Sequence, residues 1–166
     1  MATSDLFRSF LITEDEGTII LALDNNIKIH KKNINTYPLN QVLPQAGSIN
    51  GLALSDDGKE LLACSTILNV YRHDGSLFAL KQSVTLGFSC WSVHYIGAFI
   101  MVFGMSPQIL LYEFNGTAYV PNLTINTVEA GIYQLDIYEN GNKFMFGGYS
   151  QRISIYALKE GSYKLD

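Results

Sequence analysis

The chain has 166 residues, enough for one domain with a substantial hydrophobic core. Apolar residues make up 48% of it and charged residues 16%, a composition that excludes an intrinsically disordered chain. The formal net charge of −4, without clustered Lys and Arg, excludes the electrostatic footprint of a nucleic-acid-binding protein. The first 17 residues lack the basic and then apolar pattern of a secretory signal, so we expect a cytoplasmic location.

Residues 82–112 contain no Asp, Glu, Lys or Arg, so we consider whether this segment could span a membrane. A spanning helix needs about 20 mostly apolar residues. The densest apolar run covers only residues 96–105, and Gly87, Gly97 and Gly104 weaken any helical pattern. The segment therefore predicts strands, and we expect no membrane partner.

The two cysteines, Cys64 and Cys90, lie 26 residues apart. They have no CxxC spacing and no histidine at a ligand spacing, so they do not indicate a metal site. One disulfide is open to them, but we expect two buried, reduced thiols.

Four units follow one another along the chain, and each begins with a strand-like segment. These segments are residues 10–13 ("FLIT"), 52–55 ("LALS"), 92–95 ("SVHY") and 135–138 ("LDIY"). A turn glycine follows in each unit, at Gly17, Gly58, Gly97 and Gly141, spaced by 41, 39 and 44 residues. An apolar run comes next, reading "TIILAL", "KELLAC", "AFIMVF" and "NKFMFGG" in the four units.

A further apolar run in each unit has an aromatic or histidine residue near its end. The four positions are His30, Tyr71, Tyr112 and Tyr156, spaced by 41, 41 and 44 residues. A second turn follows at Asp74-Gly75, Asn115-Gly116 and Glu160-Gly161, with residues 33–35 in its place in the first unit. Asp-Gly and Asn-Gly between apolar runs are strong hairpin signals, because Gly accepts φ > 0. For the second unit, the pattern predicts strands at 50–54, 59–65, 67–72 and 77–84.

Four-stranded units that recur every 40–45 residues are typical of propeller blades. One twisted four-stranded sheet cannot bury both faces alone, and stacking sheets around an axis covers them. We therefore predict an all-β fold, a β-propeller of four-stranded antiparallel blades with four repeats of about 41 residues. Residues 1–166 are expected to form one propeller domain or partial propeller, with blades near 5–46, 47–87, 88–130 and 131–166.

The second unit, "LALSDDGKELLACSTILNVYRHDG", resembles a WD-repeat blade. Residues 55–59 match the Ser-Pro-Asp-Gly-Lys turn of that family, and Val70-Tyr71 stands where the family has Val-Trp. The fourth unit, "LDIYENGNKFMFGGYSQRISIYAL", fits the same frame. The units depart from the family in lacking its Gly-His pair, its tetrad Asp and its Trp-Asp ending. The resemblance implies a divergent WD-type propeller with a role in binding other proteins.

Four units do not decide whether this chain closes a ring by itself, because propellers usually have 4–8 blades. The chain is either a fragment of a larger propeller, half of an eight-bladed ring formed by two copies, or a small four-bladed ring. We favour the fragment, because the C-terminus cuts through a predicted strand. The expected partners are therefore a protein of unknown identity and either a second copy or the remaining blades.

Three histidines are the main candidates for catalysis, and each has a simpler explanation. His30 occupies the position that Tyr fills in the other units. His73 precedes the turn residue Asp74, and adjacent residues in a strand point to opposite faces. His94 alternates with Trp91, Val93 and Tyr95 in a short strand. We therefore predict no catalytic residues.

The acidic runs at 14–16 and 56–57 fall in the first turns of their units, where Asp serves the backbone conformation. They lack the spacing of a calcium loop, so we expect no bound metal. The glycine patterns of phosphate-binding loops and dinucleotide folds and the Ser nucleophile elbow are all missing. We accordingly expect no cofactor.

The remaining candidate is a protein-binding surface on the loops between strands two and three and between successive blades. Aromatic residues, Met and Arg are enriched in interfaces and their hot spots. The predicted surface residues are Trp91, Met105, Tyr133, Tyr149 and Arg152.

The sequence thus favours a non-catalytic protein-protein interaction module, part of a larger scaffold. The alternative is an enzyme or small-ligand-binding propeller whose site lies on the central axis near His94 and Asp136.

Overall fold

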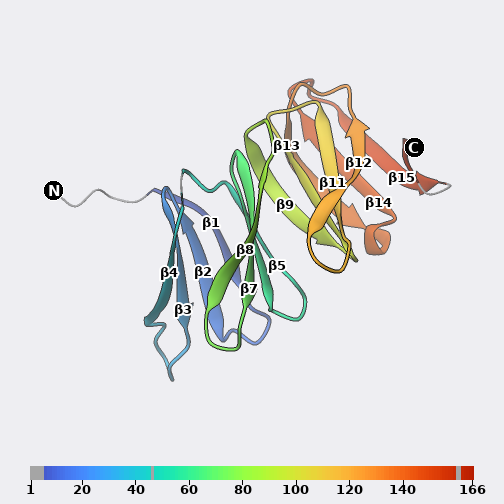
Figure 1. The fold of residues 1–166 in the computed structure, drawn as a ribbon. Helices are drawn as coiled ribbons and strands as arrows, with labels where there is room; N and C mark the ends of the chain where they lie inside the picture. Colours follow the sequence, from blue (N-terminus) through green and yellow to red (C-terminus); the bar gives the residue numbers. More distant parts are fainter. Residues whose placement is uncertain (1–5, 46, 160–161) are drawn as a thin grey trace. The chain divides into compact units, whose positions relative to one another are not determined.

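The structure is a computed structural model that describes residues 6–45, 47–159 and 162–166. Within these ranges the chain forms strands and one short 3-10 helix (Figure 1). The elements are β1 (Phe7–Ile12), β2 (Thr18–Leu23), β3 (Asn26–Lys31), β4 (Leu39–Pro44), β5 (Gly51–Leu54), β6 (Glu60–Cys64), β7 (Ile67–His73), β8 (Phe78–Thr85), β9 (Cys90–Ile96), β10 (Phe99–Gly104), β11 (Gln108–Phe114), β12 (Tyr119–Asn126), β13 (Ile132–Tyr138), η1 (Glu139–Gly141), β14 (Lys143–Gly148), β15 (Ile153–Lys159) and β16 (Ser162–Leu165).

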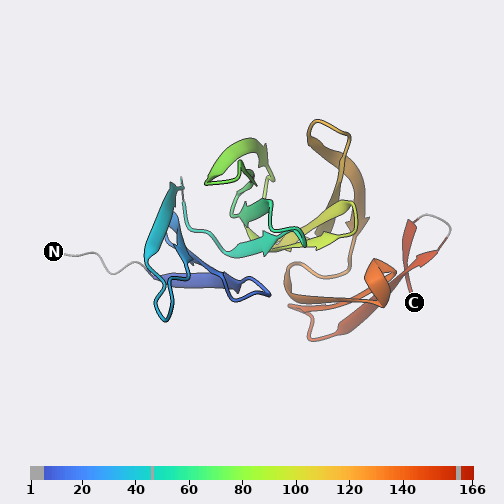
Figure 2. The same ribbon diagram turned by 90° about the horizontal axis from the view of Figure 1, so that it is seen from below.

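The strands form four antiparallel sheets of four, which we call blades 1 to 4 in chain order (Figure 2). In every blade the spatial order of the strands follows the sequence, so each blade is a meander of three hairpins. This confirms the predicted all-β fold of four-stranded antiparallel blades. The four strands of blade 2 begin and end within one residue of their predicted limits. The predicted limits of blade 1, at residues 5 and 46, fall outside the described residues.

The first turns of blades 1 and 2 are built by the same hydrogen bonds. In blade 2, the Asp57 carboxylate accepts bonds from the Ser55 hydroxyl (2.7 Å) and the Lys59 amide (3.0 Å), and Gly58 has φ 69°. In blade 1, Asp15 accepts the matching bonds from Thr13 (2.6 Å) and Gly17 (2.8 Å). The residue in the left-handed conformation there is Glu16, at φ 53°, and Gly17 is the next residue of the same turn.

Side-chain oxygens also close the second turns. The Asp74 carboxylate accepts hydrogen bonds from the amides of Ser76 and Leu77, both at 2.9 Å. The Asn115 side chain accepts the same two bonds in blade 3, from Thr117 and Ala118. Hydrogen bonds from backbone amides stabilise the charged form of a carboxylate, so in the folded chain the pKa of Asp74 is lowered to about 2. The predicted turn at Glu160-Gly161 lies outside the described residues.

The chain divides into two compact units between Leu86 and Gly87, and each has its own core between two blades. The first core joins blades 1 and 2 through Ile20, Ala22, Ile27, Ile29, Leu43, Ile49, Leu52, Leu61, Ala63, Tyr71 and Phe78. The second joins blades 3 and 4 through Ile96, Met101, Phe103, Ile109, Leu111, Ile125, Ile132, Leu135, Phe144, Phe146 and Tyr156. The repeated aromatic position, at Tyr71 and Tyr156, is therefore a core position.

Two further expectations concern the apolar middle of the chain. Cys64 and Cys90 are both fully buried, but neither is a free thiol in the structure, so the expectation of reduced thiols is wrong. The described residues contain no helix with the length and hydropathy needed to cross a bilayer. The charge-free segment from 82 to 112 instead supplies β9, β10 and β11.

Candidate interaction surface

Three aromatic side chains from blades 3 and 4 meet at one end of their sheets. Trp91 is near the start of β9, Tyr133 is near the start of β13, and Tyr149 follows the end of β14. The Trp91 and Tyr133 rings are stacked, with centroids 4.8 Å apart and planes 8° apart. Tyr149 lies tilted against both, at 4.7 Å from Tyr133 and 6.3 Å from Trp91. We call these three residues the aromatic cluster.

Close backbone contacts at glycines hold the cluster in place. A Cβ on Gly104 would lie 2.2 Å from the Ser89 carbonyl oxygen and 2.7 Å from the Trp91 amide nitrogen. A Cβ on Gly131 would lie 2.7 Å from the Tyr149 ring. Only a residue without a side chain allows these approaches, so the glycines fix the separation between the strand ends that carry the rings.

The aromatic cluster leaves much of its surface in contact with solvent. Tyr133 is 53% exposed and Tyr149 is 50% exposed, whereas Trp91 is half-buried. The side-chain hydrogen bond with Tyr149 raises the pKa of Tyr133, with smaller contributions from burial and from the charge of Tyr149. The Tyr133 hydroxyl is therefore neutral at physiological pH, and the cluster exposes flat apolar rings with polar tips to solvent.

A buried acid beside this end of the sheets was not anticipated. The Glu129 side chain is fully buried, and its carboxylate accepts hydrogen bonds from the Ser150 amide (2.8 Å) and the Ser150 hydroxyl. These two bonds lower the pKa of Glu129 and tie the loop before β13 to the residue after Tyr149. No sequence motif marks Glu129, because its partner is 21 residues away along the chain.

The other two predicted surface residues differ in their placement. Met105 is exposed at the end of β10, and its amide donates a hydrogen bond to the Ser89 carbonyl (2.8 Å), next to the strand that carries Trp91. Arg152 is also exposed, but the structure gives it no ring contact with the aromatic cluster. Its positive charge acts on Glu129, and it borders a groove of about 400 Å³ with Ile153 and Leu165.

His94 and Asp136 do not form a shared polar site. The His94 ring stacks on Phe103 at 5.6 Å, its Nε2 lies 3.1 Å from the Ser92 hydroxyl, and burial lowers its pKa. Asp136 is exposed, its carboxylate accepts the amide hydrogen of Ile137 (3.0 Å), and its charge only partly offsets the shift at His94. Neither an ion pair nor a hydrogen bond joins the two side chains, both of which are described.

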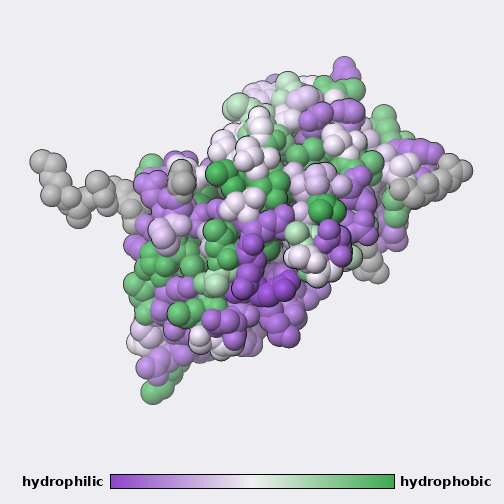
Figure 3. All heavy atoms as spheres, viewed as in Figure 1, coloured by the Kyte–Doolittle hydropathy of each residue, from purple (hydrophilic) through white to green (hydrophobic). Residues whose placement is uncertain are grey.

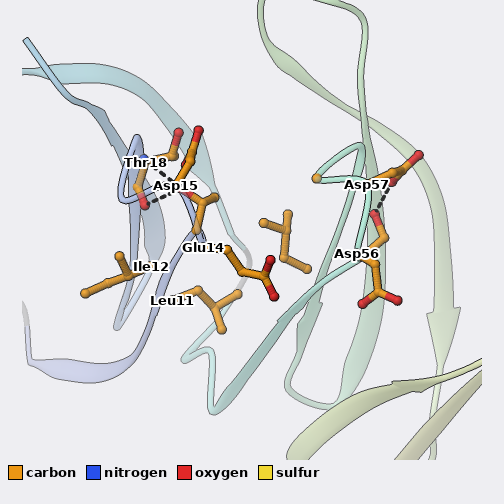
Figure 4. A pocket seen from close by; sticks show the side chains of 11 residues that line it. Leu11, Ile12, Glu14, Asp15, Thr18, Asp56 and Asp57 are labelled. Carbon is orange, nitrogen blue, oxygen red and sulfur yellow. Dashed lines mark hydrogen bonds between the residues drawn. The ribbon is translucent and has the colours of Figure 1, made fainter. Parts of the chain in front are cut away.

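An acidic pocket lies between the first turns of blades 1 and 2. It has a volume of about 460 Å³, and Figure 4 shows Glu14 and Asp56 beside it together with Leu11. The Asp15 and Asp57 carboxylates are engaged by their own turns, as described above. Among the described residues, no group of three or more His, Cys, Asp or Glu side chains is arranged to hold a metal ion.

Comparisons with known proteins identify the fold. No protein-family model and no curated protein sequence matches the chain. Among solved structures, U3-55K matches with a TM-score of 0.79 and 14% identity over 99% of this chain and 53% of its own. The WD40 repeats of RRP9 match with a TM-score of 0.79 and 14% identity over 99% of this chain and 52% of theirs.

A third matching structure is described as an enzyme, unlike the first two. A candidate 6-phosphogluconolactonase from Bacteroides uniformis superposes with a TM-score of 0.82 and 12% identity, over 98% of this chain and 54% of its own. This chain therefore spans about half the length of each of these three structures. Together with the four antiparallel sheets, the matches show a WD-like β-propeller fold with four blades, and at these identities they show the fold alone.

Proposed function

We propose that this chain is a protein-protein interaction module that binds its partner through the aromatic cluster. The observation that carries the proposal is the stacking of Trp91, Tyr133 and Tyr149 into one exposed apolar surface. Trp and Tyr are enriched in the hot spots of interfaces because they bury a large area at a low cost in side-chain entropy. Met105, exposed beside the cluster, extends the same surface.

The structure of the cluster also supports a rigid binding site. The rings are held by one another, by the close approaches at Gly104 and Gly131, and by the bonds between Glu129 and Ser150. Preorganised side chains lose little freedom on binding, so more of the contact energy contributes to affinity. Arg152 supplies a positive charge near this surface and favours a partner with acidic residues at the rim. The cytoplasmic location remains a prediction.

Quantitative affinity capture tests this proposal. The chain and its Tyr133→Ala and Tyr149→Ala variants are immobilised at equal density and exposed to the same cell extract. We expect a set of proteins whose recovery falls at least tenfold with either variant. Leu80→Ala, which truncates an exposed apolar residue on β8, is the matched control and should leave that set unchanged. If every captured protein responds equally to all three variants, the cluster is not the binding surface.

A catalytic role has a separate test. The fold is shared with a candidate 6-phosphogluconolactonase, so 6-phosphogluconolactone is the substrate to try first. We expect hydrolysis at the uncatalysed rate, because His94 is engaged by Phe103 and Ser92 and has no acidic partner in direct contact. A rate above background that His94→Gln abolishes would establish an enzyme and overturn the non-catalytic proposal.

A further inference from the structure

Two β-bulges present the rings of Trp91 and Tyr133. On β9, the register shifts opposite Phe103 and Gly104, and Trp91 is the extra residue that the pairing passes over. A matching shift on β13 makes Tyr133 the extra residue of that strand. The first strand of blade 2, β5, pairs with β6 without such a shift. Because a bulge redirects the side chain of its extra residue, the two rings meet through a specific departure from the regular sheet.

The aromatic cluster leaves the surface of two rings open to a ligand. Trp91 and Tyr133 stack with their planes 8° apart, so each ring covers one face of the other. Tyr149 is inclined by 49° to Tyr133, with the ring centroids 4.7 Å apart, and both tyrosines are half exposed. The exposed surface is therefore built from two flat rings that are tilted against each other. In the space-filling view, hydrophobic and hydrophilic residues alternate over the blades that carry it (Figure 3).

The hydroxyls at the tips of these two rings keep one proton for a ligand. Tyr133 and Tyr149 share a side-chain hydrogen bond. A pair of hydroxyls has two protons, and the bond between them uses one. The other proton remains to donate to an acceptor of a ligand. The tyrosine pair therefore presents apolar ring surface beside one hydrogen-bond donor.

The charges around the cluster argue against a cationic ligand. An aromatic site for a quaternary ammonium group places ring faces against the cation. The facing sides of Trp91 and Tyr133 are instead closed by their stacking. Glu129 is buried and its carboxylate is bonded to Ser150, whereas the charge that acts on it comes from the exposed Arg152 and is positive. An acidic group of a ligand is therefore favoured beside the rings.

A proline-rich segment matches these features. In the polyproline II conformation the backbone makes no internal hydrogen bonds, so its carbonyl groups are available to a donor such as the remaining tyrosine proton. Proline-rich segments dock on aromatic-lined surfaces, where the pyrrolidine rings pack against flat aromatic rings. The conformation exists before binding, so little conformational entropy is lost. Other extended segments supply less flat apolar surface and lose more freedom.

We propose that the aromatic cluster binds a proline-rich segment of a partner protein, with prolines against Tyr133 and Tyr149 and an acidic residue of the segment toward Arg152. The segment binds in the polyproline II conformation and accepts the remaining tyrosine proton at a backbone carbonyl. This partner class rests on the proposed function of the cluster as an interaction surface. Every residue that takes part belongs to the second compact unit, from Gly87 to Asp166.

Peptide titration tests the proposal, because Trp91 is the only tryptophan of the chain and its fluorescence reports on the cluster. The probe is the synthetic peptide Asp-Asp-Pro-Pro-Leu-Pro-Pro-Leu-Pro, and the control peptide has alanine at every proline. We expect saturable binding of the probe and binding of the control that is weaker by about tenfold or more. Calorimetry measures the variants. Tyr133→Ala and Tyr149→Ala should each weaken binding of the probe about tenfold or more, and Leu80→Ala, on β8, should not.

Two further variants test the geometry and the charge of the site. Gly131→Ala keeps all three rings, but its Cβ would lie 2.7 Å from the Tyr149 ring and must displace it. We expect binding of the probe to weaken about threefold or more. Arg152→Gln should weaken binding of the probe about threefold and leave unchanged the binding of a peptide with serine in place of aspartate. Circular dichroism checks that each variant keeps its β-sheet spectrum.

Failure of the partner class and failure of the interaction surface give different results. If the probe does not bind while capture from cell extract still depends on Tyr133 and Tyr149, the partner class is wrong and the interaction surface stands. A trimethyllysine peptide that binds in place of the probe, with the same dependence on the tyrosines, identifies a cationic ligand and also overturns the proposal. Binding of the probe that both tyrosine variants leave intact overturns it as well. Absence of probe binding together with absence of tyrosine-dependent capture rejects the interaction surface itself.

Discussion

The first turns of blades 1 and 2 and the aromatic cluster of blades 3 and 4 use their side chains in opposite ways. Four acidic residues of these turns line a pocket. The carboxylate oxygens of Asp15 and Asp57, however, accept hydrogen bonds from amides and hydroxyls of their own turns. The aromatic rings contact one another and still leave half the surface of two of them open. The Asp15 and Asp57 carboxylates thus stabilise their own turns, whereas the Tyr133 and Tyr149 rings remain exposed to solvent.

The largest expected effect is a loss of stability when Gly104, whose close backbone contacts support the aromatic cluster, is replaced. In Gly104→Ala, the added Cβ meets backbone atoms of Ser89 and Trp91 that cannot rotate away. We expect a loss of about 3 kcal/mol in the free energy of unfolding, from overpacking and strand displacement. Chemical denaturation measures it. Gly47→Ala, where a Cβ has open space, is the control, and equal losses in the two variants would show that the close approach does not support the cluster.

A smaller effect is expected from removing one ring. Trp91→Leu keeps an apolar side chain but loses the stacked contact with Tyr133. We expect a loss of about 1–2 kcal/mol, again by denaturation. Phe99→Leu truncates a half-buried aromatic residue of β10 without a described ring contact and should cost less. If Phe99→Leu costs as much as Trp91→Leu, the stacking contributes nothing beyond the area that it buries.

The turn carboxylates predict a dependence of stability on pH. The pKa of Asp74 is about 2 in the folded chain, below its ordinary value of 3.8. A lowered folded pKa contributes stability above pH 3.8 and loses it as the pH falls toward about 2. Asp74→Asn keeps the acceptor oxygen but has no charge to titrate, so its denaturation midpoint should fall less over this range. Asp56→Asn, at a residue without a described hydrogen bond, should follow the unmodified chain.

The smallest expected effect concerns the hydroxyls of the cluster. Tyr149→Phe removes the hydrogen bond that is the largest cause of the raised pKa of Tyr133. The pKa of Tyr133 should therefore fall toward its ordinary value, while the stability of the fold changes little. Ultraviolet absorbance at rising pH, with tyrosines assigned by substitution, measures the shift. An unchanged Tyr133 pKa would assign the shift to burial instead.

Local signals account for the parts of the fold that the sequence predicts well. The strands of blade 2 were predictable because Asp57-Gly58 and Asp74-Gly75 form turns through their own side chains and glycines. In the first turn of blade 1, counting from glycine to glycine aligns Gly17 with Gly58, whereas Glu16 is the residue that takes the left-handed position of Gly58. The hydrogen bonds of Thr13 and Asp15, rather than the glycine, mark the true register.

The candidate surface was predictable only in part. Trp91 and Tyr133 occupy equivalent positions near the starts of β9 and β13, and Tyr149 directly follows β14, so the repeat brings these strand ends together. Arg152 lies in the same connection between β14 and β15 as Tyr149, but nothing in the repeat determines the direction of its side chain. Glu129 was missed because its bonds to Ser150 join two loops that only the folded sheets bring together.

The short outer strand of blade 4 has a practical consequence for anyone who purifies the chain. β16 pairs with β15 only from Tyr156 to Lys159, whereas β12 pairs with β11 from Gln108 to Phe114. Ile153 and Ser154 therefore lie on a strand edge with no outer neighbour among the described residues. Such an edge templates the addition of further strands. We expect concentrated solutions of the chain to form fibrous aggregates with time. Ile153→Lys, which places a charge on this edge, should slow their formation.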